Sequence, residues 1–134
     1  MPVTYPQSQE QAIATGSIHP EPLLGTWLNT NTATRGIASA ILSRQSGQIT
    51  VRIVAAGDPG PGEWGETGAS LFAADASSHE AMAFSAFYDF GFMETQLQAH
   101  VRQGVLIIAK FDRFKDSSGR SNYFSKEFFY RAEQ

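Results

Sequence analysis

Strict alternation of apolar and polar side chains across residues 92–102 is the sequence feature that most constrains this fold. Met93, Thr95, Leu97, Ala99 and Val101 alternate there with Glu94, Gln96, Gln98, His100 and Arg102. Successive side chains of a β-strand point to opposite faces, so this period of two predicts a strand with one face on a core and the other in solvent. Similar segments bounded by turn residues predict seven further strands, at residues 23–30, 36–44, 48–56, 63–73, 81–88, 105–114 and 122–131.

The turn residues between these segments predict that successive strands pair antiparallel. Ser46-Gly47 and Gln103-Gly104 suit tight hairpins, because glycine tolerates the positive φ that such turns require. Eight antiparallel strands in sequence close most economically into an up-and-down barrel, since closure removes exposed sheet edges. The sequence therefore predicts an all-β, eight-stranded antiparallel barrel, with a two-sheet sandwich as the alternative fold.

The first part of the chain lacks this strand pattern. Residues 1–22 are predicted to form an N-terminal leader or plug segment, ahead of a barrel domain at residues 23–134. Within the leader, Ser8 and Gln11 have the spacing of a capping box, so a short helical segment is expected at residues 11–14. Gly16 and Pro20 would end that segment.

The composition excludes several classes of function. The chain has no cysteine, which removes disulfides, thiolate catalysis and cysteine zinc sites. Its net charge is −3 and its basic residues are scattered, so nucleic acid is not an expected partner. The three histidines share no ligand spacing, and neither a metal nor a cofactor is expected. No signal peptide or membrane-length apolar run is visible, which predicts a cytoplasmic protein without a membrane partner.

The stretch Gly60–Gly65, G-P-G-E-W-G, matches the G-x-G-x-x-G pattern of a dinucleotide-binding loop. A phosphate site of that kind needs a helix directly after the glycines, whereas Thr67 and Gly68 disfavour a helix there. Pro59 and Pro61 also remove two N–H donors that a phosphate would use. The stretch is therefore interpreted as a Pro/Gly loop at the rim of a barrel.

Both ends of the strand region carry a recognisable pattern. The first expected strand contains Gly25-Thr26-Trp27, a G-x-W pattern, and the last ends in Arg131. With eight strands, this combination resembles the calycin superfamily, which includes lipocalins, fatty-acid-binding proteins, nitrobindins and the avidin group. Patterns such as W-G-E and Y-D-F-G-F also resemble small stand-alone bacterial barrel proteins of unassigned function. The calycin resemblance implies that Trp27 plugs one end of the barrel and that Arg131 packs over its ring by a cation–π contact.

Aromatic residues supply the expected ligand site. Phe is the commonest of them, with 10 copies, and such a supply builds a core or lines an apolar cavity. Trp64 is expected at the barrel mouth, with Glu66 beside it on the same strand face. The alternative is that Trp64 covers the rim and that Glu66 is in solvent. The residues expected to line the interior are Phe84, Tyr88, Phe111, Phe124, Phe128 and Tyr130.

The polar residues divide into expected surface groups and candidate acids. The polar face of residues 92–102 is expected to face solvent, and so is Lys110 on a later strand. Glu66 near the mouth and Asp89 between two aromatic residues are the candidate acid–base groups, because burial would raise the pKa of a carboxyl group there. For Asp89 the alternative interpretation is a carboxylate that caps its own turn.

These patterns lead to two functional hypotheses. The first is a small-molecule-binding, calycin-like barrel that holds a hydrophobic or aromatic ligand in its interior. The alternative is a cofactor-independent cyclase or isomerase that acts on a hydrophobic biosynthetic intermediate within the barrel, with Glu66 and Asp89 as acid–base groups and Tyr88 as a donor. A third, structural role is a filled barrel that forms a homodimer through the face of residues 92–102. All three hypotheses depend on which side chains of each strand point into the barrel. A shift of one residue in strand register reverses that assignment.

Overall fold

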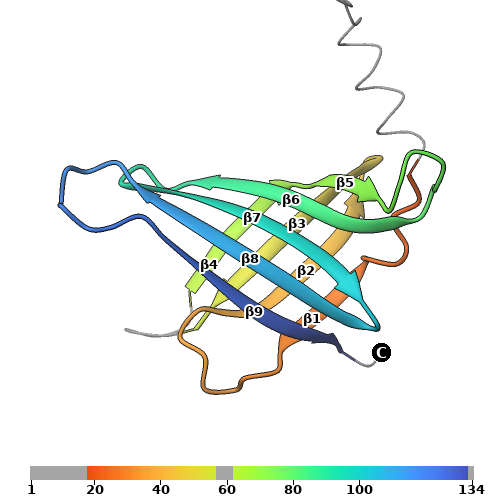
Figure 1. The fold of residues 1–134 in the computed structure, drawn as a ribbon, viewed down its shortest axis with the longest axis horizontal. Coiled ribbons are helices and arrows are strands. Elements are labelled where there is room, and N and C mark those ends of the chain that lie inside the picture. The colour runs from red at the N-terminus through yellow and green to blue at the C-terminus, as the bar shows by residue number, and fades with distance from the viewer. Residues whose placement is uncertain (1–17, 57–61, 133–134) are drawn as a thin grey trace, which may run out of the picture.

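A computed structural model describes residues 18–56 and 62–132, and in these residues it shows nine β-strands and no helix (Figure 1). The strands are β1 (Gly25–Asn29), β2 (Ile37–Gln45), β3 (Gln48–Ala55), β4 (Gly62–Gly68), β5 (Ser70–Ala73), β6 (Ala81–Asp89), β7 (Met93–Arg102), β8 (Val105–Phe114) and β9 (Tyr123–Arg131). The helical segment predicted at residues 11–14 lies outside the described residues. The division between leader and barrel at residue 22 stays a prediction.

All nine strands belong to one antiparallel sheet, which curls into a nearly closed barrel. The order is β4-β3-β2-β1-β9-β8-β7-β6-β5, so the sandwich alternative does not apply. The predicted count of eight strands is wrong, because residues 63–73 form both β4 and β5. β4 pairs with β3 whereas β5 pairs with β6, so one stretch of chain passes from one edge of the sheet to the other and brings the two edges together.

Side chains bridge the junction between β4 and β6. The Tyr88 hydroxyl donates to the backbone carbonyl of Gly65 at 2.8 Å and lies 3.2 Å from that of Val51. Two residues further along β4, the Thr67 hydroxyl donates to the backbone carbonyl of Phe87 in β6 at 3.1 Å. A strand edge must find partners for its carbonyls, and these hydrogen bonds provide them where the barrel closes.

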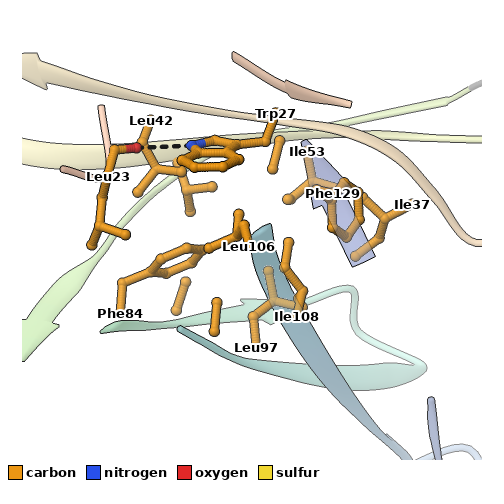
Figure 2. Close-up of a cluster of buried hydrophobic side chains, with 14 of the residues drawn as sticks. Leu23, Trp27, Ile37, Leu42, Ile53, Phe84, Leu97, Leu106, Ile108 and Phe129 are labelled. Carbon is orange, nitrogen blue, oxygen red and sulfur yellow. Dashed lines mark hydrogen bonds between the residues drawn. The ribbon is translucent and has the colours of Figure 1, made fainter. Parts of the chain in front are cut away.

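Large apolar side chains fill the interior (Figure 2). Trp27 and Phe84 face each other from opposite walls, and further side chains close the space between them. The largest fully buried apolar residues are Leu23, Trp27, Ile37, Leu42, Val51, Ile53, Phe84, Leu97, Leu106, Ile108 and Phe129. A barrel of about eight strands is just wide enough for side chains to fill it. The central part of the barrel is therefore a packed core, not the open lining that was expected.

Trp27 and Arg131 make the contact that the calycin resemblance implies. The two residues are paired across β1 and β9, and the guanidinium carbon lies 4.4 Å from the indole centroid. Arg131 also donates to the backbone carbonyls of Pro22 and Leu24. The indole N–H of Trp27 donates to the carbonyl of Leu23 at 3.0 Å. These bonds fasten the segment before β1 over this end of the barrel.

The faces of β7 and β8 give opposite outcomes for the sequence predictions. In β7, Thr95, Leu97 and Ala99 are buried and the polar residues between them lie outside, as predicted. In β8, the inward residues are Leu106, Ile108, Lys110 and Asp112. The prediction that Lys110 faces outward is wrong. The outward face of β8 is also apolar, so its alternation does not show which face is buried.

Candidate functional site

The Gly60–Gly65 stretch leads into a strand. β4 begins at Gly62 and continues past Gly65, so the described residues that follow the glycines provide no helix N-terminus for a phosphate group. The interpretation as a loop at the barrel rim stays a prediction, and Gly62–Gly65 of the stretch belong to β4. Residues 57–61 of the preceding loop lie outside the described part of the chain.

Trp64 and Glu66, which were predicted to share a face, point to opposite sides of the wall. The pairing of β3 with β4 shifts at Trp64, and Gly65 beside it adopts a φ of 83°. A bulge of this kind re-aims the side chains around it. Trp64 packs against the core, whereas Glu66 lies outside, 3.8 Å from Arg52, and accepts a 2.7 Å hydrogen bond from Gln45. Glu66 is therefore not beside Trp64 at a binding surface.

Asp89 caps the turn between β6 and β7. Its Oδ1 atom accepts hydrogen bonds from the backbone N–H of Gly91 at 2.8 Å and from Lys115 at 2.9 Å. The Lys115 ammonium holds the pKa of Asp89 below its ordinary value. Asp89 is an exposed, ionised turn residue, as in the alternative interpretation. Neither of the two predicted acid–base groups is brought to the interior.

The predicted aromatic lining divides between the two sides of the barrel wall. Phe84 and Tyr88 point inward and are buried. The other four lie on the outer face and are 41–55% exposed: Phe111, Phe124, Phe128 and Tyr130. The prediction that these four line the interior is wrong. β8 is apolar on both faces, and the long polar loop before β9 left the register of β9 open.

A buried ion pair lies inside the barrel. Lys110 Nζ donates to Asp112 Oδ2, and the hydroxyl of Thr95 donates to Asp112 Oδ1. Lys110 is only 8% exposed and Asp112 only 2%. A buried charge is costly unless it is paired and hydrogen-bonded, and both partners meet that condition here. This pair is the most polar feature of the barrel interior that the structure describes.

Strand register places the ion pair beside an aromatic cluster. One inward-facing row crosses β6, β7, β8 and β9, and its members are Tyr88, Thr95, Asp112 and Tyr123. Neighbours in such a row have Cβ atoms about 5 Å apart. Tyr88 in turn contacts Trp64 and Phe90, with ring centroids 5.3 and 5.7 Å away. We call the seven residues Trp64, Tyr88, Phe90, Thr95, Lys110, Asp112 and Tyr123 the polar-end site.

The aromatic half of this site is a cluster of three rings in mutual contact. Trp64 meets Tyr88 and Phe90 edge-on, and Tyr88 and Phe90 are parallel to within 3°. Burial raises the pKa of Tyr88 to about 12, so its hydroxyl stays protonated and remains a donor to the Gly65 carbonyl. Edge-to-face and offset-stacked aromatic pairs are the favourable geometries for such rings. The cluster forms an apolar wall on the inner side of the barrel, two strands from Asp112 along the same row.

Tyr123 covers the ammonium group of Lys110. The Lys110 nitrogen lies 4.7 Å from the centre of the Tyr123 ring and 3.4 Å from its hydroxyl. Tyr123 itself is 50% exposed. Its ring stacks on Phe114 at 6.3 Å, and the Arg120 guanidinium lies 4.2 Å above Phe114. A half-exposed ring at the base of the β8–β9 hairpin, which projects at the left of Figure 1, therefore covers this buried charge.

Five members of the site were not predicted as site residues: Phe90, Thr95, Lys110, Asp112 and Tyr123. One sequence signal pointed to three of them, Thr95, Lys110 and Asp112. The turn at Gln103-Gly104 is a two-residue hairpin, so it pairs Arg102 with Val105. That register aligns the buried face of β7 with Leu106, Ile108, Lys110 and Asp112. Combining the turn length with the clear alternation of β7 would have placed the charged pair inside.

Comparisons with protein-family models, with curated proteins and with solved structures find no match for this chain. The likeness to calycin barrels therefore rests on the nearly closed antiparallel barrel and on the contact between Trp27 and Arg131. Within residues 18–56 and 62–132, no helix has the length and apolar character needed to cross a membrane. In the same residues, no three His, Asp or Glu side chains gather as a metal site would require.

Proposed function

We propose that this protein binds a small molecule at the polar-end site. The ligand would have an apolar or aromatic body and an oxygen acceptor such as a carbonyl or a carboxylate. The ligand class is the one expected from the aromatic content of the sequence. Its place changes, because the centre of the barrel is packed and four of the expected lining residues lie outside.

The observation that carries this proposal is the buried ion pair of Lys110 and Asp112. Replacing a buried ion pair by apolar residues of similar size is often neutral or stabilising, so such a pair is weak evidence for a role in stability. Strongly polar groups inside an apolar pocket are typical of binding and catalytic sites. The pair therefore favours a role in recognition.

Lys110 has donor capacity left for a ligand. An ammonium group carries three protons, and the described contacts of Lys110 Nζ are with Asp112 and Tyr123. The second contact is long, at 3.4 Å, and its partner is the half-exposed ring. A ligand oxygen that displaces the Tyr123 hydroxyl would accept a charge-assisted hydrogen bond from Lys110.

The aromatic wall supports the apolar part of the same ligand. Trp64, Tyr88 and Phe90 lie on the β4 and β6 side of the ion pair, with ring centroids 5.2–5.7 Å apart. A planar ligand body would pack against these rings while its oxygen reaches Lys110. Most of the binding free energy would come from the apolar area, and the polar groups would fix the orientation.

Isothermal titration calorimetry with two probes tests this proposal. 2-Naphthoate offers a carboxylate on an aromatic body, and 2-acetylnaphthalene offers a carbonyl on the same body. The variant to compare is Lys110→Met with Asp112→Asn, which removes both charges and leaves neither unpaired. A hydrogen bond to a charged group contributes about 1.5–3 kcal/mol, so we expect probe binding about 10- to 100-fold weaker in the double variant.

Matched controls lie on the outside of the barrel. Lys126→Met removes an exposed lysine from β9, and Glu66→Gln and Asp89→Asn remove the two outer carboxylates. All three controls should bind the probes as the wild-type protein does. Equal affinity of the wild-type protein and the Lys110/Asp112 double variant would refute the proposed site.

The cyclase or isomerase alternative gains support from the same pair. An ammonium group beside a carboxylate can polarise a carbonyl and pass a proton, which Glu66 and Asp89 are not placed to do inside the barrel. The two functions differ in what happens to a ligand that co-purifies with the protein. A ligand recovered unchanged after incubation supports binding alone. A product of equal mass with a different NMR spectrum, absent with the double variant, supports an isomerase.

A further inference from the structure

Exposed aromatic side chains gather on the outer face of β6, β8 and β9. Five of them are 41–55% exposed: Phe87, Phe111, Phe124, Phe128 and Tyr130. Phe111 and Phe124 stack with ring centroids 5.4 Å apart. An aromatic side chain presents about 200 Å² when fully exposed, so five half-exposed rings leave roughly 500 Å² of apolar surface. That area is at the upper end for the largest apolar patch of a monomer, about 300–600 Å².

Strand register arranges this outer face in rows. An aromatic row crosses β6 to β9, with Phe87, Gln96, Phe111 and Phe124. The next row is small or polar, with Ser85, Gln98, Ala109 and Lys126. A third row follows, with Ala83, His100, Ile107 and Phe128. The side chains of one row lie about 7 Å from those of the next along each strand.

The rows form a ridge beside a depression. A hollow of about 550 Å³ lies over the second and third rows, where Ala83, Ser85 and Ala109 leave space. A second hollow of about 550 Å³ lies at the aromatic row, with Phe87, Phe111 and Phe124 in its wall. Both hollows are on the outside of the barrel, and Gln96 belongs to both. The face therefore offers large exposed aromatic side chains next to a recess lined by small residues.

Glu94 and Arg102 give the outward row of β7 opposite charges at its two ends, and Glu94 also pairs with Lys115 at 3.4 Å and lies opposite Arg113 of β8. The outward residues of β7 begin with Glu94 and end with Arg102, and neutral or weakly basic residues lie between them. The two residues are eight positions apart on one strand, which separates them by roughly 26 Å. Within one molecule they are too far apart to form an ion pair.

We propose that this face binds a second copy of the chain, around a two-fold axis that runs across the strands at the level of Gln98 and Ala109. In a two-fold interface the same patch serves both copies, so residues on opposite sides of the axis meet each other. The ridge of Phe87 and Phe111 on each copy then enters the recess over Ala83 and Ile107 on the other. At the two ends, Glu94 of each copy meets Arg102 of the second copy.

The exposed area is what a stable dimer needs. A standard interface buries about 800 Å² on each partner, and in homodimers about 65% of it is apolar, or roughly 500 Å². The five aromatic side chains provide roughly that area. In a two-fold dimer, each feature of this face must fit another feature of the same face on the second copy. The charges of Glu94 and Arg102 and the aromatic row beside the recess meet that requirement, which a different partner would not impose. This face adjoins the polar-end site, because Asp112 and Tyr123 of that site also line the hollow at the aromatic row.

Sedimentation velocity over a range of protein concentrations tests the proposal. We expect a concentration-dependent dimer for the wild-type protein. Phe111→Glu puts a charge into the centre of the interface and should weaken the dimer by about 30-fold or more, as for a central aromatic contact. Phe92→Glu is the matched control, because Phe92 is an equally exposed aromatic residue, 47%, that lies in the turn outside this face. Thermal melting followed by circular dichroism checks that each variant is folded.

A charge exchange provides a second test that does not depend on the aromatic variant. Glu94→Arg alone and Arg102→Glu alone should each weaken the dimer by about tenfold, because each puts like charges opposite one another. The variant with both exchanges should recover the wild-type affinity. Since the two positions are too distant to pair within one molecule, recovery can only come from contact between copies. A wild-type protein that stays monomeric at its highest soluble concentration, or a double exchange that fails to recover, would overturn the proposal.

Discussion

Removing the Lys110 amine while Asp112 stays in place should destabilise the protein strongly. The side chains of these residues are 10% and 0% exposed, so Lys110→Met leaves a carboxylate buried with the Thr95 hydroxyl as its described partner. Loss of one member of a buried ion pair costs about 3–5 kcal/mol. The whole folding free energy of a domain is about 5–15 kcal/mol. We therefore expect Lys110→Met to remove about a fifth or more of the stability.

The double variant Lys110→Met/Asp112→Asn should recover most of that loss. The asparagine that replaces Asp112 keeps an oxygen where Thr95 donates, and the methionine that replaces Lys110 fills a similar volume without a charge. A buried pair exchanged for uncharged groups is often close to neutral, so we expect the double variant to lie within about 1.5 kcal/mol of the wild-type protein. The coupling free energy between the two positions should then be at least about 2 kcal/mol.

Urea unfolding followed by tryptophan fluorescence measures these free energies by linear extrapolation. Lys126→Met is the control for removing a lysine from the exposed outer face. Because Lys126 lies in the proposed dimer face, the control is measured at a protein concentration at which the chain is monomeric, and its effect there should stay within about 0.5 kcal/mol. The reasoning fails if the effects of the two single variants simply add, or if Lys110→Met costs less than about 1 kcal/mol. Either result would mean that the Lys110 amine reaches water and that the pair is not a buried one.

Three further predictions concern other contacts. Tyr88 should ionise at about pH 12 in a titration followed at 295 nm, with Tyr88→Phe to identify its step. Because folding raises its pKa, its contribution to stability should be full below about pH 10 and be lost as the pH rises to about 12, by up to about 1.4 kcal/mol per pH unit. A Tyr88 step near pH 10 would contradict its burial. Gly25→Ala should cost about 1–3 kcal/mol in urea unfolding, because Gly25 has a φ of 121° and a Cβ atom would lie 2.9 Å from Arg131 Nη1; an unchanged midpoint would contradict this. Glu127→Gln should speed hydrogen exchange at the backbone amide of Ile37, because that amide donates to the charged Glu127 Oε1 at 3.0 Å and the variant weakens the bond. An unchanged exchange rate would contradict a role of this hydrogen bond in protecting the amide.

Strand positions could be predicted well from the sequence because alternation and turn residues are local signals. β8 (Val105–Phe114) has the predicted bounds, and most other strand ends agree within two residues. The break between β4 and β5 could not be predicted, because it depends on which neighbour each half pairs with across the closing barrel. Glycines at 65 and 68 indicated an irregularity there but not its consequence for Trp64 and Glu66.

Which side of the barrel wall each side chain faces was harder to predict. The errors lie where a charged side chain is buried or an aromatic side chain is exposed. Lys110 was assigned to solvent, and charged side chains are indeed rarely buried. Phe111 and Phe124 were assigned to the interior because exposed aromatic residues are normally scattered. Natural sequences tend to break such rules at functional sites. Both departures are therefore the positions at which we propose a ligand and a second copy of the chain.

The most direct test of the binding proposal uses the two tryptophan residues as reporters. Trp64 belongs to the polar-end site, whereas Trp27 is buried beside Arg131 and donates its indole N–H to Leu23. A ¹H–¹⁵N spectrum resolves both indole signals, and Trp64→Phe assigns them. During titration with 2-naphthoate or 2-acetylnaphthalene, we predict that the Trp64 signal shifts and the Trp27 signal stays in place. A shift of Trp27 with no shift of Trp64, or no shift of either signal with both probes, would contradict the proposed site.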